Sequence, residues 1–459
     1  MRYSVVNFAE VKAVDDFRID AHYWHPVFIR NSALVSPYQK LRDFVCQNIA
    51  NIKSSPINTD FEYLEISQIS LSSFEYQTTN IQLGEEPDRA HHLLEKGDVV
   101  VSTVRPNRNA VAFIKTDGIV GSSGLAVLRP NNIEAEYLLA FCKTSYFVNC
   151  LMRANKASMY PAVSIRDVLN TALFVPSESP RLLIAETVKN SIFALEKAKQ
   201  IYAEALTLLL SELGLADWQP KQQLTFVKNF SDTERAGRID ADYFQPKYDE
   251  IVDAIKSYSG GWDMLGNLAT LKKCVEVGSR EYLETGIPFV RVSNLSPFEI
   301  TQEKYISKEL YAELAEHQPK QGEILFSKDA TPGIAYYLRE APEKMIPAGG
   351  ILRLQNKSDR INNEYLTLVL NSILTQEQVN RDVGGSVILH WRPDQVAGTV
   401  IPILYQEKQA EIEQKVIESF NLRRRAKDLL EHAKRAVEIA IEQDEQAAID
   451  WLESVSQMP

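Results

Sequence analysis

The sequence is poor in cysteine and contains no long apolar run. Its four cysteines among 459 residues form no CxxC pair, so we expect neither a disulfide scaffold nor a cysteine zinc site, and we expect the cysteines to be small buried residues. No stretch approaches the roughly 18 consecutive apolar residues that a membrane helix needs. Residues 1–11 also lack the apolar segment of a secretion signal. These absences predict a cytoplasmic protein that does not enter a membrane.

Sequence motifs of common nucleotide-dependent enzymes are also missing. The chain has no GxxxxGK[ST] phosphate loop, no Asn-Pro-Pro-Tyr or Asp-Pro-Pro-Tyr tetrapeptide, and no glycine-rich turn that opens a helix after a strand. Residues 118–124 are rich in glycine but precede a strand-like segment, so a phosphate cradle is not expected there. The sequence therefore predicts a chain without catalytic activity and without a cofactor of its own.

The sequence also lacks an excess of basic residues. The net charge is -11, which argues against a nucleic-acid partner because phosphate binding usually needs a basic surface. The charge is unevenly distributed, however. Residues 137–166 contain four basic residues and no acidic one, and residues 99–116 contain three basic residues and no acidic one. A local basic surface could therefore bind DNA, although the negative net charge suits a protein partner.

An internal repeat organises the sequence. Residues 18–26, RIDAHYWHP, match residues 238–246, RIDADYFQP, at an offset of 220. Further elements recur in the same order, as strand-like segments at 96–102, 111–114 and 124–128 against 321–327, 335–338 and 350–354, and as helical patterns at 136–149 and 364–379. The offset stays between 220 and 228, which indicates two copies of one structural unit.

The repeat also decides between explanations for polar motifs. His22 and His25 have the HxxH spacing of a metal site, but the second copy has Asp242 and Gln245 in their places, so we expect no zinc site. The pair of an arginine and an aspartate two residues later occurs in both copies, at 18–20 and 238–240. We expect it to form a local salt bridge or a cap at the start of each copy, and not to act in acid catalysis.

A long helix is predicted after each copy. Its repeating positions, spaced alternately three and four residues apart, are Val188, Leu195, Ala198, Tyr202, Ala205 and Leu209 in the first helix and Val416, Arg423, Ala426, Leu430, Ala433 and Val437 in the second. This spacing is typical of a coiled coil. Ser191 and Ser419 also fall on it, so small residues recur where two helices could approach closely. Arg423 replaces an apolar residue and is expected to extend toward solvent or a partner.

The predicted fold is α+β, with two tandem β-rich domains, each followed by a long helix. The two helices are expected to form an antiparallel coiled coil with pseudo-two-fold symmetry. The alternative is that each helix packs only on its own domain. The predicted boundaries are a first domain at 1–177, a central helix at 178–215, a linker at 216–235, a second domain at 236–403 and a C-terminal helix at 404–459.

This duplicated plan resembles the specificity subunit of Type I restriction-modification enzymes. The resemblance covers nearly the whole chain and rests on the RIDA openings, the strand starts at Gly97 and Gly322, and the closing segments 164–176 and 391–402. None of these is a catalytic motif, so their order and duplication carry the resemblance. The second copy has Arg392-Pro393 where the first has Arg166-Asp167, so the loop beside this position need not match the family.

The resemblance implies that the two domains are target recognition domains. They would read a bipartite, asymmetric target in double-stranded DNA, while the helices act as spacers and dock methyltransferase subunits, two of which are expected, and restriction or translocase subunits. The system would serve phage defence through DNA methylation. S-adenosylmethionine, ATP and Mg would be bound by the partner subunits. A helix from residue 181 to 213 would be roughly 50 Å long, the rise of about 14 base pairs.

Candidate DNA-binding residues lie in predicted loops, because base reading needs Arg or Lys for guanine and Asn or Gln for adenine. They are Arg105, Asn107, Arg108, Arg153, Asn155, Lys156 and Tyr160 in the first domain and Lys272, Lys273, Arg280, Lys328, Arg381 and His390 in the second. For any one of them, a solvated surface position is an equally good explanation.

Two other functions fit the same plan. The chain could be a coiled-coil scaffold whose duplicated domains bind proteins, which its acidic charge would suit. It could also be the recognition subunit of another methylation-based defence system. Salt-sensitive DNA binding would exclude the scaffold, and the neighbouring genes would separate the two defence systems.

Overall fold

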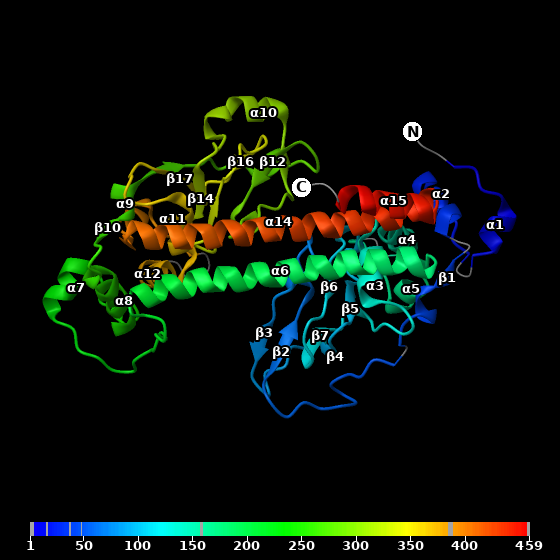
Figure 1. Cartoon of the computed structure of the whole chain (residues 1–459), viewed down its shortest axis with the longest axis horizontal. Helices are drawn as coiled ribbons and strands as arrows, with labels where there is room; N and C mark the ends of the chain where they lie inside the picture. Colours follow the sequence, from blue (N-terminus) through cyan, green and yellow to red (C-terminus); the bar gives the residue numbers. More distant parts are fainter. Residues whose placement is uncertain are drawn as a thin grey trace. The chain divides into compact units, whose positions relative to one another are not determined.

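The computed structural model describes residues 4–14, 17–35, 38–46, 48–156, 159–383 and 389–456. The fold is mixed α+β, with several small sheets and two long helices, α6 (Glu178–Glu212) and α14 (Gln406–Glu442) (Figure 1). The chain divides into two compact units, which are Met1–Leu195 with Arg423–Pro459 (unit 1) and Glu196–Leu422 (unit 2). Each long helix therefore lies partly in unit 1 and partly in unit 2. We call residues 4–177 of unit 1 head 1, and residues 236–403 of unit 2 head 2.

Head 1 and the C-terminal segment of unit 1 contain short helices and strands. The helices are α1 (Phe8–Lys12), α2 (Pro26–Val35), α3 (Ala135–Lys143), α4 (Ser145–Ala154), α5 (Ile165–Leu169) and α15 (Glu445–Ser456). The strands are β1 (Gln39–Lys40), β2 (Phe61–Leu64), β3 (Thr79–Ile81), β4 (Ala90–Leu94), β5 (Val99–Ser102), β6 (Val111–Phe113), β7 (Ile119–Ser122), β8 (Leu125–Leu128) and β9 (Ala172–Leu173).

Unit 2 has a matching set of elements. Its helices are α7 (Phe230–Ala236), α8 (Pro246–Ser257), α9 (Leu265–Leu268), α10 (Lys308–Glu313), α11 (Asn363–Asn371), α12 (Ile373–Asp382) and α13 (Pro393–Ala397). Its strands are β10 (Trp262–Met264), β11 (Ala269–Lys273), β12 (Ile287–Val290), β13 (Tyr305–Ile306), β14 (Glu323–Ser327), β15 (Ala335–Tyr337), β16 (Ile346–Pro347), β17 (Ile351–Asn356) and β18 (Val400–Pro402).

The two heads repeat the same strand pairings. In head 1, β5 lies between β6 and β8, and in head 2, β14 lies between β15 and β17, all antiparallel. A parallel pair recurs as β2 with β7 and as β12 with β16. Each head is closed by an antiparallel pair, β1 with β9 and β10 with β18. The predicted strand-like segments and their order in both copies are confirmed.

A buried carboxylate fixes the start of the central strand in each head. Asp98 pairs with Arg129 at 2.9 Å, and Glu323 pairs with Arg353 at 3.6 Å. Both carboxylates also accept a main-chain N–H from the turn three residues earlier, at 2.8 and 3.0 Å. Gly97 and Gly322 precede them with φ of 92° and 87°, a left-handed conformation that favours glycine. The repeated Gly-Asp and Gly-Glu pairs therefore have a structural role.

A tyrosine ties a helix to the closing strand segment in each head. The hydroxyl of Tyr137 donates to the carbonyl oxygen of Phe174 at 2.6 Å, and that of Tyr365 donates to Pro402 at 3.1 Å. Both rings are fully buried. Burial raises the pKa of each hydroxyl well above its ordinary value, so both stay protonated donors at neutral pH. The two hydrogen bonds hold α3 and α11 in equivalent positions.

The helical runs predicted from residues 136 and 364 are each broken into two helices. The Thr144 hydroxyl donates to the carbonyl of Phe141 at 2.7 Å and accepts the N–H of Phe147 at 3.2 Å. Ser372 makes the corresponding bond to Val369 at 2.7 Å. These side chains end one helix and cap the next, because a hydroxyl can satisfy main-chain groups that a continuous helix would bond. The expectation of a single run was therefore wrong at these two residues.

The repeat begins earlier than the RIDA motif. The N–H of Asn7 bonds to the Glu10 side chain at 3.0 Å at the start of α1, and the N–H of Asn229 bonds to Asp232 at 3.3 Å at the start of α7. The salt bridges expected within the RIDA motifs are confirmed, since the arginine lies 2.5 Å from the aspartate in the first copy and 2.8 Å in the second.

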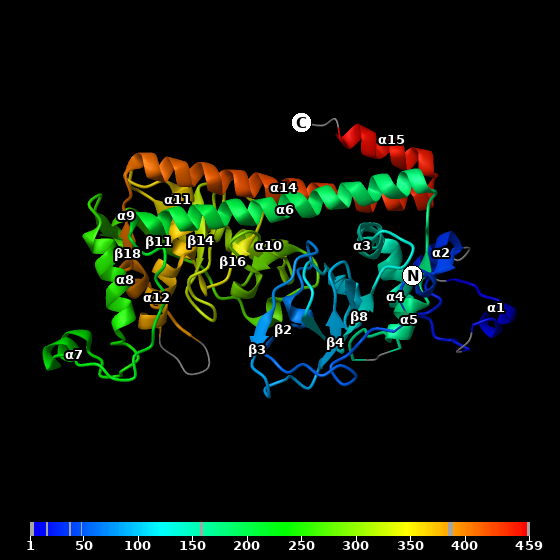
Figure 2. The same cartoon turned by 60° about the horizontal axis from the view of Figure 1, so that its bottom comes forward.

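The long helices contact each other within each unit (Figure 2). In unit 1, the Ser191 hydroxyl donates to the carbonyl of Ala426 at 2.6 Å. In unit 2, Ser419 donates to Ala198 at 2.7 Å, and the pairs Lys415–Glu204 and Lys408–Glu212 lie at 2.9 and 3.0 Å. Residue numbers rise on one helix as they fall on the other, so the two segments of unit 2 run antiparallel. The helix expected over 404–459 is divided, since α14 ends at Glu442 and α15 follows.

Candidate nucleic-acid interface

The residues predicted at the helix contact are mostly buried. Of the twelve, ten are buried, namely Val188, Leu195, Ala198, Ala205, Leu209, Val416, Ala426, Leu430, Ala433 and Val437. Tyr202 is partly buried and lies edge-on to Phe298 with ring centroids 5.0 Å apart. Ala205, Leu209 and Val416 belong to the same apolar core as residues of head 2. The end of α6 thus packs on head 2, so the alternative that each helix packs only on the domain before it is wrong for α6.

Arg423 makes a contact that the sequence did not predict. Its guanidinium lies 3.8 Å from the carboxylate of Glu75 in head 1, and its side chain is only 13% exposed. The residue that interrupts the apolar spacing of α14 therefore joins the helix to a head within unit 1.

The turn after the central strand of head 1 has an unusual backbone conformation. We call residues 105–109 the head-1 turn. Arg105 and Asn109 have φ of 50° and 52°, a left-handed conformation that non-glycine residues rarely adopt. The Arg105 N–H donates to the carbonyl of Pro161 at 2.7 Å. Hydrogen bonds to the neighbouring segment therefore fix this turn.

Head 2 has a turn at the corresponding place. We call residues 329–333 the head-2 turn. Ala330 and Gly333 have φ of 59° and 94°, and the Ala330 N–H donates to Leu389 at 2.9 Å. Near its start, each turn therefore has a left-handed residue that is bonded to a distant segment of its head. The turns differ in sequence and in backbone structure, since of the two only the head-1 turn contains a 3-10 helix, over Pro106–Arg108.

Several predicted residues of head 1 gather at the head-1 turn. Arg105, Asn107, Arg108, Lys156 and Tyr160 are exposed, and the Arg105 guanidinium lies 6.0 Å from the centre of the Tyr160 ring. The Asn155 side chain accepts the N–H of Ala162 at 3.0 Å and so helps to hold the segment that carries Tyr160. A cation, amides and an aromatic ring on one exposed turn are suited to contacts with bases and phosphates.

Two other predicted residues make contacts inside their own head. Arg153 lies over the Tyr23 ring at 4.2 Å and donates to the Tyr23 carbonyl at 3.3 Å. Its counterpart Arg381 lies over Tyr243 at 4.7 Å and is 3.4 Å from Asp249. Both guanidinium groups are thus engaged at equivalent places, where each clamps the start of its copy.

Head 2 presents a different set of side chains at its turn. Lys328 and His390 both pair with Asp329, and the His390 Nδ1 lies 2.9 Å from the carboxylate. Lys272 is bonded to Gln355 at 2.8 Å and lies 3.4 Å from Glu323. Lys273 on β11 and Arg280 in a short turn are exposed. Residues 384–388, within the polar segment that precedes His390, lie outside the described residues.

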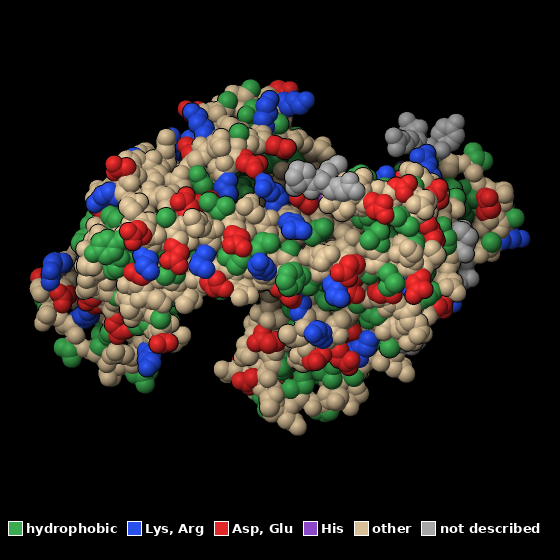
Figure 3. Space-filling model, in the orientation of Figure 1, with side chains coloured by type: hydrophobic (Ala, Val, Ile, Leu, Met, Phe, Trp, Pro, Cys, Tyr) green, Lys and Arg blue, Asp and Glu red, His purple; other side chains and the backbone are tan. Residues whose placement is uncertain are grey.

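The surface charge is mixed. On the face drawn in Figure 3, basic and acidic side chains alternate along α14 and do not gather in one large area. Affinity for a polyanion would therefore have to come from local groups such as those at the turns.

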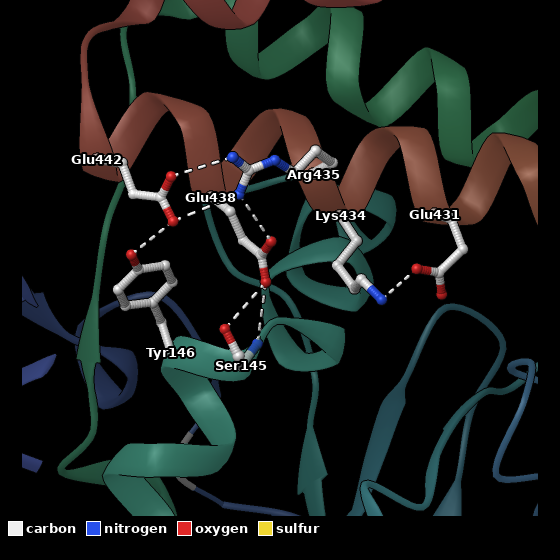
Figure 4. Close-up of polar contacts among 7 residues, drawn as sticks. All are labelled: Ser145, Tyr146, Glu431, Lys434, Arg435, Glu438 and Glu442. Carbon is white, nitrogen blue, oxygen red and sulfur yellow. Dashed lines mark hydrogen bonds and ion pairs between the residues drawn. The ribbon is translucent and has the colours of Figure 1, made fainter. Parts of the chain in front are cut away.

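A polar cluster joins α14 to α4 in unit 1 (Figure 4). Glu438 accepts the N–H and the hydroxyl of Ser145 at 3.2 and 3.1 Å, and Glu442 accepts the Tyr146 hydroxyl at 2.8 Å. Burial, together with Glu442, raises the pKa of Tyr146. Arg435 bonds both glutamates. This attachment was not predicted from the sequence, where its signal is the spacing of Glu438 and Glu442 on one helix face.

The described residues offer neither a metal site nor a membrane-spanning helix. These residues include no group of three histidine, cysteine or acidic side chains that could hold a metal ion. His22, one of the pair with HxxH spacing, lies 2.8 Å from the carbonyl of Met152. Within the same described ranges, no helix combines the length and the apolar character needed to cross a bilayer.

No protein-family model matches the chain, and no curated protein sequence matches it. Solved structures do match. The HsdS subunit from Thermoanaerobacter tengcongensis is 19% identical, with a TM-score of 0.32 over 90% of this chain and 95% of that chain. A structure described as the basis of complex assembly and conformational transition of the type I R-M system is 20% identical, with a TM-score of 0.32 over 90% and 96%. The Type-I restriction-modification system S subunit from M. genitalium is 13% identical, with a TM-score of 0.36 over 90% and 95%. Each of these structures matches this chain over nine-tenths of its length.

Proposed function

We propose that the chain is the DNA-recognition subunit of a Type I restriction-modification complex. Each head would read one half of a bipartite, asymmetric target in double-stranded DNA. The observation that carries the proposal is a strained turn at the corresponding place of each head, at which the first head presents Arg105 and the second presents Lys328 and His390. Turns at corresponding places that carry unlike side chains suit two readers of unlike base sequences.

The long helices would set the distance between the half-sites. We propose that they form one antiparallel coiled coil with pseudo-two-fold symmetry, and the reciprocal serine hydrogen bonds at Ala426 and Ala198 support this. Helix α6 has 35 residues, or about 52 Å at 1.5 Å per residue, which equals the rise of about 15 base pairs.

Methylation, ATP-driven translocation and cleavage would belong to partners. We propose that two methyltransferase subunits dock on this chain, one for each of its two similar units, and that restriction subunits join the complex. S-adenosylmethionine, ATP and Mg would be bound by those subunits, and this chain would carry out no reaction. A related methylation-based defence system remains an alternative with the same role for this chain.

The proposal is tested by selection of DNA from a random pool. The full-length chain is mixed with duplexes whose randomised core exceeds the ~15 base pairs that match α6 in length, and bound duplexes are sequenced at low and moderate salt. The expected result is two unlike short motifs at a fixed spacing, with binding that falls steeply as salt rises. Retention of duplexes without any enriched motif would contradict base-specific reading.

A scaffold for protein partners is the second candidate, because the net charge of -11 disfavours a polyanion. It predicts no salt-sensitive binding of any duplex in the same selection. Its expected partners would be retained by the full-length chain at salt concentrations that abolish DNA binding.

A further inference from the structure

Lys143 is a buried cation behind the head-1 turn. It is the last residue of α3 and is 8% exposed. Its Nζ donates to the carbonyl of Asn109 at 3.3 Å, and the Asn109 amide donates in return to the carbonyl of Lys143 at 3.0 Å. Asn109 is one of the two left-handed residues of the turn. Two reciprocal bonds therefore connect the end of a core helix to the corner of the turn.

Head 2 has an asparagine at the equivalent place. Asn371 is the last residue of α11, 228 positions after Lys143. Its amide donates to the carbonyl of Ala335 at 2.8 Å and accepts the N–H of Ala335 at 2.9 Å. Ala335 begins the strand that follows the head-2 turn. The same helix end thus braces the chain in both heads. Lys143 holds the last residue of the head-1 turn with an amine, and Asn371 holds a residue two positions after the head-2 turn with an amide.

The charges around Lys143 come from two helices. Burial lowers its pKa to about 7, which Glu431 of α14 and the neighbouring Cys142 oppose and Lys434 of α14 reinforces. Glu431 is itself paired with Lys434 (Figure 4). The amine therefore changes its charge near neutral pH, whereas an asparagine side chain does not titrate.

We propose that Lys143 is a positioning residue of head 1. By holding the Asn109 carbonyl it would fix the head-1 turn in the conformation that reads DNA, so that one half-site and not the other depends on Lys143. The inference rests on the proposed function. An ammonium group forms a stronger hydrogen bond to a carbonyl than a neutral amine does. Reading by head 1 should therefore weaken as the pH rises through 7, and this weakening should disappear when Lys143 is replaced by a side chain that does not titrate.

The test uses the full-length chain with three substitutions, Lys143→Met, Lys143→Gln and Asn371→Ala. Each protein is used to select duplexes from the randomised pool at pH 6 and pH 8, and discrimination is compared between the two half-sites. Lys143→Met should lose roughly tenfold discrimination at one half-site, the loss expected when a hydrogen bond to a charged group disappears. Lys143→Gln should keep most of it and abolish its pH dependence. Asn371→Ala should reduce discrimination only at the half-site that head 2 reads.

A second measurement does not need DNA. Hydrogen exchange of residues 104–113 at one pH should be faster in Lys143→Met than in the wild type and nearly normal in Lys143→Gln. Unchanged exchange in Lys143→Met would overturn the positioning role, and so would an equal effect of that substitution on both half-sites. If the wild-type chain selects no sequence at all, the proposed function fails and this inference fails with it. If it selects two motifs and Lys143→Met changes neither, only the inference fails.

Discussion

The hydroxyl of Ser191 donates a hydrogen bond of 2.6 Å to the main-chain carbonyl of Ala426. The bond joins α6 to α14 inside unit 1, and Ser419 makes its equivalent to Ala198 inside unit 2. A hydroxyl reaches the carbonyl of a neighbouring helix only where small side chains let the two backbones come close. The repeated serines and alanines therefore mark the positions of closest approach in both units.

Replacing the alanine at either position should separate the helices. Ala198→Glu and Ala426→Glu would each place a larger, charged side chain at a buried position of the helix contact. We expect each to lower the free energy of unfolding by about 3 kcal/mol, measured by denaturant unfolding.

The matched control is Ala203→Glu, because Ala203 lies on the exposed face of α6. It should change the free energy of unfolding by less than about 0.5 kcal/mol. Equal effects at positions 198 and 203 would show that close helix contact is not what makes an alanine necessary.

The tyrosines that anchor α3 and α11 should contribute to stability independently. Tyr137→Phe and Tyr365→Phe each remove one buried hydrogen bond, and we expect a loss of about 1 kcal/mol for each. The bonds lie in different units, so the double variant should lose about 2 kcal/mol. Tyr160→Phe, at an exposed ring, is the control. A double variant no less stable than either single one would disprove the equivalence of the two anchors.

Acid should weaken the ion pair between Arg18 and Asp20 at the start of head 1. The hydrogen bond from Arg18 lowers the pKa of Asp20 to about 2. A carboxylate with a depressed pKa stabilises the fold above its unfolded pKa of about 4, and this contribution is lost as the pH falls toward the folded value. Asp20→Asn should therefore destabilise the protein at pH 6 and have a smaller effect at pH 3, measured by thermal unfolding.

Asp253→Asn is the control for that measurement, because it makes the same substitution on the exposed face of α8. If Asp20→Asn has the same effect at both pH values, the ion pair with Arg18 does not contribute to folding.

The two turns should control separate half-sites. Arg105→Ala should reduce base preference in one enriched motif, and Lys328→Ala should reduce it in the other, by roughly tenfold for a direct contact to a base edge. Sequencing of selected duplexes measures both motifs together. Arg166→Ala, at an exposed residue of α5, serves as the control. Loss of both motifs in either single variant would refute the division of reading between the heads.

Periodicity and repetition predicted the local structure of much of the chain. The strand segments around Val99 and Ile324 were found because runs of branched apolar residues after a glycine are strongly patterned. The long helices followed from spacings of three and four. Comparing the two copies also argued against a metal site, since only one copy has the HxxH spacing. These features depend on residues close in sequence, which a single sequence displays directly.

Tertiary contacts could not be predicted in the same way. The guanidinium groups of Arg153 and Arg381 stack on tyrosines 130 and 138 residues earlier in the chain, a contact that the sequence did not indicate. Lys143 appeared as part of a basic segment and proved to be buried. Thr144 divides a helical run through side-chain bonds that periodicity does not register. In each case the environment of a polar side chain is set by residues distant in sequence.

The left-handed conformation of Arg105 has an evolutionary consequence. An arginine in this conformation costs about 1 kcal/mol relative to glycine, so Arg105→Gly should make the protein more resistant to heat while removing the guanidinium from the turn. Laboratory selection for thermal tolerance alone should therefore favour changes at position 105 and erode recognition by head 1. Under the proposed function, thermal tolerance and base selectivity would therefore be in direct conflict at a single residue.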